Sequence, residues 1–249
     1  EKSFIEDYYN WMLGTCALAN STAFGRVNTL KWLMYIAQEK GWIRIHPFVS
    51  FECMPEYKRR SFLSEEELQR MIHVELKYKR QRTMRDMFLF MCFTGLAYAD
   101  LKAITYDNIH TDSDGGTWLM GNRIKTGVAY VVKLLPIAIE LIEKYRGMDE
   151  KKDSPECVFP VGEYNTMFLS LKIIGKKCNC RAEVTPHIGC HTFAVLAILK
   201  GMPLETLQKV LGHKSILSTQ IYAELINPKV GEDTDKICKK IGHVYKLAM

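Results

Sequence analysis

The chain has 249 residues, of which 47% are hydrophobic, and 34 basic against 28 acidic side chains give a formal net charge of +6. This length and apolar content exclude a disordered chain and allow one large domain or two modest ones. No apolar run reaches the ~20 residues that span a bilayer, and the first residues lack the order of a signal peptide. We therefore expect a cytoplasmic protein without a membrane segment, and the charge favours a polyanionic partner only weakly.

The eight cysteines suggest neither a disulfide framework nor a metal site. No pair forms a C-x-x-C motif, and Cys178 and Cys180 are separated by a single residue, which is not the usual spacing of zinc ligands. We therefore expect reduced thiols and no bound metal.

Two helices are expected in the first 45 residues. Phe4, Tyr8, Trp11 and Met12 are expected on one face of the first helix, and a second apolar stripe covers residues 29–37. The second helix is expected to end near Gly41, and the residue before Pro47 is pushed out of the helical region. A small helical unit closes there.

Residues 48–61 show neither helical nor strand periodicity. They contain Pro55 and the basic run Lys58-Arg59-Arg60, a composition typical of a linker. We place a domain boundary near Tyr57, which divides the chain into residues 1–57 and 58–249.

The second part of the chain predicts a mainly α domain with one small antiparallel β-sheet. Ser64 and Glu67 have the spacing of a helix capping box. Residues 84–96 are apolar nearly all round, as in a buried helix, and reach a C-terminal glycine at Gly95. Two apolar runs, at 118–120 and 128–132, flank a turn and predict a hairpin, with an earlier turn at 114–116.

Helical periodicity returns over residues 136–145 and holds through most of residues 162–230. A helix over residues 192–200 is expected to stop at Gly201, and Pro203 opens another that ends before Gly212. His213 is therefore expected just past a helix C-terminus.

Four segments of the second domain carry groups suited to chemistry on a phosphate. They are Lys125-Thr126-Gly127, the run from His187 to Thr192, Leu211-Gly212-His213, and Tyr222. Each alone is most simply structural, as a solvated turn lysine, a capping histidine or a packing tyrosine. Together they offer the nucleophile, proton donor and imidazoles that splitting a phosphodiester without a metal requires.

The order of these segments resembles the tyrosine recombinase (phage integrase) family, in the style of the integrases of conjugative transposons. The matching residues are Thr94-Gly95-Leu96, Lys125, His187-x-x-Cys190-His191-Thr192, Leu211-Gly212-His213 and Tyr222. The resemblance covers nearly the whole second domain and implies the DNA breaking-rejoining catalytic fold for residues 58–249. Residues 1–57 look like the C-terminal part of the family's helical, SAM-like core-binding domain, so the chain is expected to be a fragment.

The resemblance implies a site-specific recombinase that cuts and rejoins double-stranded DNA attachment sites without metal, nucleotide or other cofactor. In the family the tyrosine forms a 3′-phosphotyrosyl link, a role that falls to Tyr222. The hairpin lysine, here Lys125, protonates the leaving 5′ oxygen. The histidines, here His187 and His213, contact the phosphate or relay protons.

Two positions depart from the family pattern, because Ala97 and Cys190 stand where the family has arginines that clamp the phosphate oxygens. Neither a methyl group nor a thiol can replace the planar fork of a guanidinium. Arg85 either repairs the first loss from the start of the buried helix or pairs with a carboxylate such as Asp86. Cys190 indicates either an impaired enzyme or a substitution introduced on purpose.

Further DNA contacts are expected from basic residues outside the motifs, which either neutralise DNA phosphates or form a solvated charge run. They are Lys58, Arg59, Arg60, Lys176, Lys177 and Arg181. Apolar positions after Tyr222, among them Ile237 and Ile241, predict a last helix. In the family such a tail docks on a neighbouring subunit, which implies a homotetramer on DNA.

Two alternatives stay open at the level of sequence. The chain could be a DNA-binding accessory protein of the same fold that no longer cuts, and Cys190 is the residue that divides this interpretation from an active enzyme. A type IB topoisomerase shares the chemistry, but the boundary at Pro47-Phe48 fits the integrase layout better.

Overall fold

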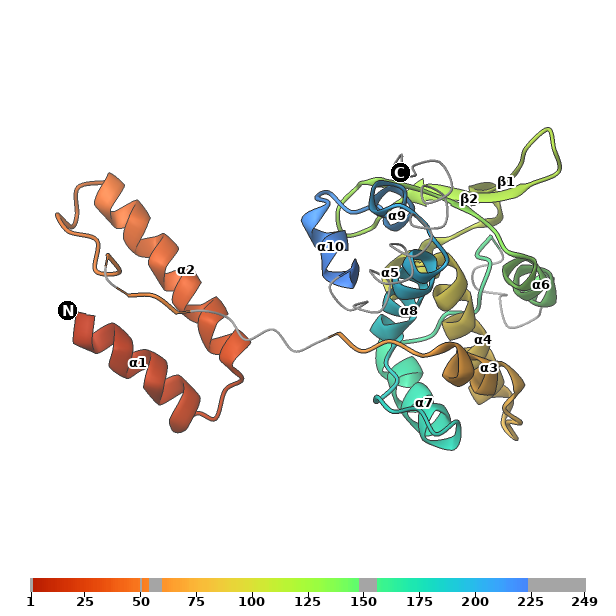
Figure 1. The fold of residues 1–249 in the computed structure, drawn as a ribbon, viewed down its shortest axis with the longest axis horizontal. Coiled ribbons are helices and arrows are strands. Elements are labelled where there is room, and N and C mark those ends of the chain that lie inside the picture. Colours follow the sequence, from red (N-terminus) through yellow and green to blue (C-terminus); the bar gives the residue numbers. More distant parts are fainter. Residues whose placement is uncertain (1, 50, 54–59, 148–155, 224–249) are drawn as a thin grey trace, which may run out of the picture. The chain divides into compact units, whose positions relative to one another are not determined.

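The computed structural model describes residues 2–49, 51–53, 60–147 and 156–223. The chain divides into two compact units, Glu1–Arg59 and Arg60–Met249 (Figure 1). This division falls two residues after the boundary expected near Tyr57. Each unit is described by itself.

Unit 1 is built from α1 (Lys2–Gly14) and α2 (Asn20–Glu39). Its core contains the buried side chains of Ile5, Met12, Ala23, Val27, Phe48 and Phe51. The aromatic row expected on the first helix is present, because Phe4, Tyr8 and Trp11 stack in succession. The row is not part of the core, since Phe4 and Trp11 are 65% and 50% exposed.

Unit 2 begins with four helical elements and a small sheet. They are α3 (Glu65–His73), α4 (Lys79–Thr94), α5 (Tyr98–Ala103), the 3-10 helix η1 (Tyr106–Asn108), β1 (Ile109–Thr111), β2 (Thr117–Asn122) and β3 (Ala129–Lys133). The three strands are antiparallel in the order β1-β2-β3, and Leu119 of β2 faces Val132 of β3. The hairpin predicted from sequence is confirmed. The first strand lies before the predicted turn at 114–116 and is not predicted by the sequence pattern.

The rest of unit 2 is helical. It contains α6 (Pro136–Tyr145), α7 (Tyr164–Lys177), α8 (Pro186–Leu199), α9 (Leu204–Leu211) and α10 (Leu217–Ala223). The mainly α fold with one small sheet is therefore as predicted. None of the described helices is both long and apolar enough to cross a membrane, and the seven described cysteines are all free thiols.

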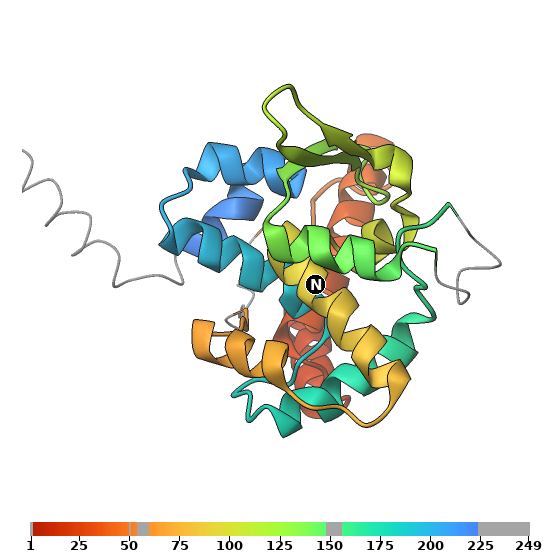
Figure 2. The ribbon, with the colours of Figure 1, turned by 90° about the vertical axis from the view of Figure 1, so that its right-hand side faces the viewer.

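Helix α4 lies at the centre of unit 2, against α6, α7 and α8. Figure 2 shows the sheet at one end of the unit and α7 at the other. The side chains of Met87, Phe88, Phe90 and Met91 are completely buried, which explains why this stretch is apolar nearly all round. The expected helix end is confirmed, since Gly95 caps α4 with a φ of +71°.

Local signals set the ends of other helices. The capping box of α3 is present, with the Ser64 hydroxyl accepting from Glu67 N and the Glu67 carboxylate accepting from Ser64 N. Helix α8 starts at Pro186, six residues before the start expected from sequence, because proline suits the first turn of a helix. This earlier start places His187 and Cys190 on the first turns of α8.

Candidate active site

Three residues that follow Pro186 lie together at the start of α8. The rings of His187 and His191, one helical turn apart, have centroids 4.4 Å apart. The Cys190 sulfur lies 3.9 Å from Nδ1 of His187 and 3.1 Å from the His187 carbonyl oxygen. Cys190 and His191 are buried, whereas His187 is exposed. The H-x-x-C-H spacing thus builds one cluster.

The turn between α9 and α10 brings His213 and Tyr222 to this cluster. Gly212 ends α9 with a φ of +57°, so that the chain reverses and His213 follows the helix C-terminus as predicted. His213 Nδ1 lies 2.9 Å from the Thr219 hydroxyl, which orients the ring. The Tyr222 ring lies 6.5 Å from that of His213 and 5.6 Å from that of His191, measured between centroids. Tyr222 is 2% exposed.

An arginine that sequence reasoning missed, Arg123, reaches the same region from the turn between β2 and β3. Its guanidinium donates to the carbonyl oxygens of Leu211 at 2.7 Å and Gly95 at 3.1 Å. It also donates to the Asp100 carboxylate at 2.7 Å. Gly212 permits this approach, since a Cβ there would lie 2.8 Å from Arg123 Cγ. The guanidinium is thereby held next to Gly95, two residues before Ala97.

Arg60 approaches from the start of unit 2. Its Nη1 lies 3.4 Å from Nε2 of His191, and its guanidinium carbon lies 5.9 Å from the centre of the Tyr222 ring. The other ring nitrogen of His191, Nδ1, lies 3.3 Å from the Ser61 carbonyl oxygen, which can only accept. This network assigns the proton of His191 to Nδ1, and Nε2 then accepts from Arg60.

Burial sets the protonation of the cluster. It lowers the pKa of His191 and of His213 to about 4, aided for His191 by His187 and Arg60 and for His213 by Arg123 and Arg60. Burial raises the pKa of the Cys190 thiol to about 11 and that of Tyr222 to about 12, and the charges of Arg123 and Arg60 oppose both shifts. Near neutral pH both histidines, the thiol and the phenol are therefore uncharged, and the local charge is that of the arginines.

The donor atoms of His187, Cys190 and His191 lie within 4.8 Å of one another, a grouping that could hold a soft divalent cation. The surroundings disfavour a cation. The only lone pair of His191, on Nε2, faces Arg60, and the charges of Arg60 and Lys125 act on His187. The cluster therefore suits an anion better than a metal ion.

Lys125 is exposed on the hairpin turn, whose backbone is fixed where Ile124 N donates to the Asp100 carboxylate at 2.8 Å. The charges of Arg60 and Lys125 help burial to lower the pKa of His187. The turn lysine thus lies on the same side of the unit as the α8 cluster.

Arg85 does not lie in this cluster, so the hypothesis that it replaces the arginine missing at position 97 is wrong. Its guanidinium binds the Asp86 carboxylate at 2.8 Å and the carbonyl oxygens of Ile72 and Val74 after α3. The physical reason is distance, because nine residues of α4 separate Arg85 from Thr94, roughly 13 Å of helix, which exceeds the reach of an arginine. The alternative expectation, an ion pair with Asp86, is the one that the structure contains.

Among the other basic residues predicted to contact DNA, the described ones gather around the end of α7. Lys176 and Arg181 are exposed around the end of α7, where they line a small pocket. Lys177 donates to the carbonyl oxygen of Glu75. Lys58 and Arg59 lie outside the described residues.

The sequence profile described as the phage integrase family matches residues 61–227. This range includes all the site residues described above except Arg60. The chain belongs to the phage integrase family. Among curated relatives, the tyrosine recombinase XerA of Saccharolobus solfataricus is 29% identical over 175 residues, covering 70% of this chain and 56% of the relative. The tyrosine recombinase XerD of Halalkalibacterium halodurans is 29% identical over 156 residues, covering 59% of this chain and 50% of the relative. The chain thus spans about half the length of these relatives.

Solved structures share the fold of this phage integrase family member. The XerH site-specific recombinase bound to a palindromic difH substrate, a post-cleavage complex, aligns with a TM-score of 0.72 and 17% identity over 94% of this chain and 71% of that chain. The Tn1549 transposon integrase in complex with a circular intermediate DNA aligns with a TM-score of 0.67 and 18% identity over 88% of this chain and 80% of that chain.

The family pattern in the sequence identified Tyr222, His213, His187 and Cys190 as site residues. It did not identify Arg123 or Arg60 as part of the site. Arg123 precedes Lys125 by two residues, yet a charged residue next to a turn is usually solvated and gives no signal by itself. Arg60 was assigned to DNA backbone contacts as part of a basic run. Only packing reveals that both arginines point into the cluster.

Proposed function

We propose that the chain cuts and rejoins duplex DNA at specific sites through a covalent bond between Tyr222 and a 3′ phosphate. The observation that supports this most is the convergence of Tyr222 with His191, His213 and two arginines that come from segments far apart in the sequence. A nucleophile beside uncharged imidazoles and fixed cations is what attack on a phosphodiester needs.

In the proposed reaction the Tyr222 oxygen bonds to phosphorus while the bond from phosphorus to the 5′ oxygen breaks. The phenol must lose its proton, and neutral His213, whose ring lies nearly parallel to that of Tyr222 with 6.5 Å between centroids, can accept it. Lys125 gives a proton to the departing 5′ oxygen. Rejoining is the reverse, with a 5′ hydroxyl attacking the phosphotyrosine.

The phosphate oxygens need cationic donors in place of the residues lost at Ala97 and Cys190. Arg123 supports the first replacement, because it is held against the Gly95 carbonyl and only three of its five N–H groups are used in the contacts with Leu211, Gly95 and Asp100. A thiol that burial keeps neutral cannot serve at position 190. A DNA-binding protein that no longer cuts is therefore the second candidate.

A covalent-trapping experiment with randomised DNA tests the proposal and identifies the cleaved sequence at the same time. The protein is mixed with a pool of nicked duplexes that carry randomised sequence around the nick, and adducts that survive a denaturing gel are sequenced. A defined duplex made from the recovered sequence should form an adduct with the parent chain and none with Tyr222→Phe. Cys190→Arg should raise the yield. If neither the parent nor Cys190→Arg forms an adduct, the second candidate is favoured.

A substrate with sulfur at the bridging 5′ position tests Lys125. A thiolate is a far better leaving group than an alkoxide and needs no proton donor. Lys125→Ala should lose cleavage of the oxygen substrate and regain it on the sulfur substrate. Equal loss on both substrates would contradict the role of Lys125 as an acid.

We further propose that unit 1 and the basic residues Lys58, Arg59, Arg60, Lys176, Lys177 and Arg181 bind the flanking duplex. Support comes from the alignment with the DNA-bound XerH complex, which extends over 94% of this chain and so includes most of unit 1. Phosphate contacts of this kind position a protein without reading sequence. Substitution of these residues should reduce the salt dependence of binding.

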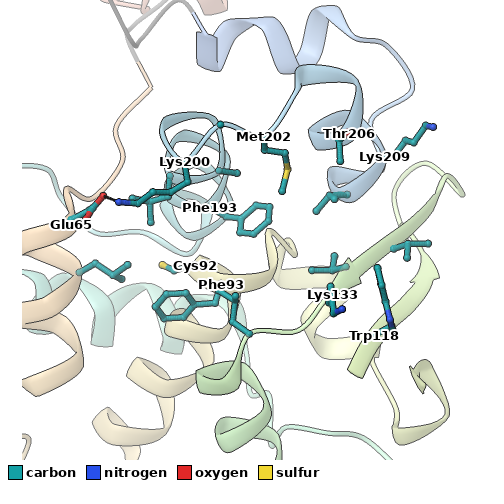
Figure 3. A pocket seen from close by; sticks show the side chains of 18 of the residues that line it. Glu65, Cys92, Phe93, Trp118, Lys133, Phe193, Lys200, Met202, Thr206 and Lys209 are labelled. Carbon is teal, nitrogen blue, oxygen red and sulfur yellow. Dashed lines mark ion pairs between the residues drawn. The ribbon is translucent and has the colours of Figure 1, made fainter. Parts of the chain in front are cut away.

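We also propose that copies of the chain assemble on DNA, as a tetramer, through the segment that follows α10. That segment lies outside the described residues, and its apolar positions at Ile237, Ile241, Val244 and Tyr245 have helical spacing. Unit 2 offers a matching apolar cavity of about 940 Å³. Figure 3 shows it between α3, α8, α9 and the sheet, with Phe93, Phe193 and Met202 among its lining. A neighbour's tail is the occupant that we propose.

A further inference from the structure

The two arginines near Tyr222, Arg60 and Arg123, have different surroundings. Arg123 is neutralised by the buried Asp100, with 2.7 Å between Nη1 and the carboxylate oxygen. Within the described part of the chain, no carboxylate pairs with Arg60, whose contacts are the uncharged His191 and the ring of Tyr222. Its charge is therefore uncompensated at the place where a phosphate would bind.

The backbone on the C-terminal side of Arg60 is fastened to α8 next to Cys190. The Ser61 carbonyl oxygen accepts from His191 Nδ1, and Leu63 N donates to the hydroxyl of Thr192 at 3.0 Å. His191 and Thr192 directly follow Cys190 in sequence. Leu63 is fully buried, which anchors the segment. Arg60 is thus held over the turn of α8 that carries the cysteine.

The influence of Arg60 extends over the whole cluster. Its charge helps lower the pKa of His187, His191 and His213, and it opposes the burial that raises the pKa of Cys190 and Tyr222. Arg123 acts on the pKa of Cys190 and Tyr222 as well, but Asp100 neutralises it. Arg60 contacts both His191, the residue after Cys190, and the ring of Tyr222. This is the position from which a guanidinium could reach an oxygen of a phosphate under attack by Tyr222.

We propose that Arg60 binds a nonbridging oxygen of the scissile phosphate and supplies the positive charge that Cys190 cannot. The inference rests on the proposed function. It assigns Arg60 a contact with the reacting phosphate instead of a contact with the flanking DNA backbone. His191 is then a positioning residue, because its Nε2 accepts from Arg60 and holds the guanidinium toward Tyr222.

The test compares two substrates at single turnover and saturating DNA. One is the defined nicked duplex recovered by trapping, and the other has a methylphosphonate at the scissile position, which replaces a charged nonbridging oxygen by a neutral methyl group. Loss of one fixed donor to such an oxygen costs about 100- to 1000-fold in rate, so Arg60→Gln should cleave the phosphate slower by that factor. On the methylphosphonate, which has no charge to neutralise, Arg60→Gln should cleave at nearly the parent rate.

A double-mutant comparison adds a readout that a purely structural role would not move. Since Cys190→Arg should by itself raise cleavage, the readout is the cost of Arg60→Gln in each background. That cost should be much smaller in Cys190→Arg than in the parent, because either guanidinium then supplies the same charge. The matched control is Arg80→Gln, which removes an exposed arginine on α4 that contacts Thr166. Its rate should equal that of the parent on both substrates.

Three outcomes would overturn the proposal. The first is an Arg60→Gln chain that cleaves the phosphate as fast as the parent does. The second is an equal loss on the phosphate and methylphosphonate substrates. The third is an equal cost of Arg60→Gln in the parent and in the Cys190→Arg chain.

Failure of the proposed function is a separate result, because it would leave the parent chain without an adduct on any substrate. Binding to a duplex selected by affinity from the same randomised pool then decides the role of Arg60, with the non-cleaving Tyr222→Phe chain as background. In that background the neutral methylphosphonate should weaken binding to the chain with Arg60 and leave binding to the chain with Arg60→Gln unchanged. Equal weakening in the two chains would refute the contact.

Discussion

Asp100 binds both Arg123 and the backbone of the β2–β3 turn that carries Lys125. Its removal tests whether these contacts stabilise the hairpin. In Asp100→Ala the guanidinium of Arg123, whose side chain is 8% exposed, loses the carboxylate at 2.7 Å, and Ile124 N loses its acceptor. Breaking a buried ion pair by deleting one partner costs about 3 to 5 kcal/mol. We expect about 3 kcal/mol, the low end of that range, because the carbonyl oxygens of Leu211 and Gly95 still accept from Arg123.

The assay is urea unfolding of the full chain, followed by circular dichroism, with amide hydrogen exchange at β2 and β3 as a local readout. Asp100→Asn keeps an oxygen that can accept from Ile124 N and should lose less stability than Asp100→Ala. The control is Asp114→Ala on the exposed β1–β2 turn, which should stay within about 0.5 kcal/mol of the parent. If Asp100→Ala unfolds within about 1 kcal/mol of the parent, the ion pair does not anchor the hairpin and the reasoning fails.

The contacts described above support three further predictions. Arg85→Gln should lower the free energy of unfolding, because it removes one of the groups that bind the buried Asp86. It should leave the cleavage rate at saturating DNA unchanged. A slower rate with unchanged stability would indicate that Arg85 does contact the phosphate. The free energy of unfolding should fall as pH drops from about 6.5, the ordinary value for histidine, toward about 4, the value that burial imposes on His191 and His213 in the folded state. A chain truncated after Lys229 should bind DNA but lose higher-order assembly in sedimentation on site DNA, and unchanged assembly would contradict tail docking.

The sign of the pH prediction follows from linkage. A folded-state pKa below the unfolded value means that the unfolded chain binds more protons, so stability is complete above pH 6.5 or so and is lost on acidification. His213→Gln should make the decline shallower in pH titrations of urea unfolding, and an identical decline would exclude His213 as a source.

A point change in the cavity complements the truncation. Val131 lies on β3, is 40% exposed and lines the apolar cavity. Val131→Glu should reduce assembly as the truncation does without loss of DNA binding, because a charge in an apolar docking surface is costly to desolvate. Full assembly of Val131→Glu would place the tail elsewhere.

Much of the fold could be predicted from local signals. The capping box at Ser64, the apolar run that became α4, the glycine after it and the hairpin are all present as expected. Elements with short or weak local sequence signals were harder to predict. The short strand β1 has three residues and little periodicity to detect, and the start of α8 depended on a single proline.

The sequence by itself identified Tyr222, the histidines and the two departures from the family pattern at Ala97 and Cys190, because motif order is a property of the chain alone. Tertiary structure decided which cations lie beside these residues. Arg85 lies in the first half of α4 and Ala97 lies just beyond its end, so the length of the helix keeps the two residues apart. Arg123 and Arg60 lie 63 residues apart in sequence and meet the cluster only after α8, α9 and the hairpin pack together. A guanidinium acts through distance and burial, and neither can be read from spacing along the chain.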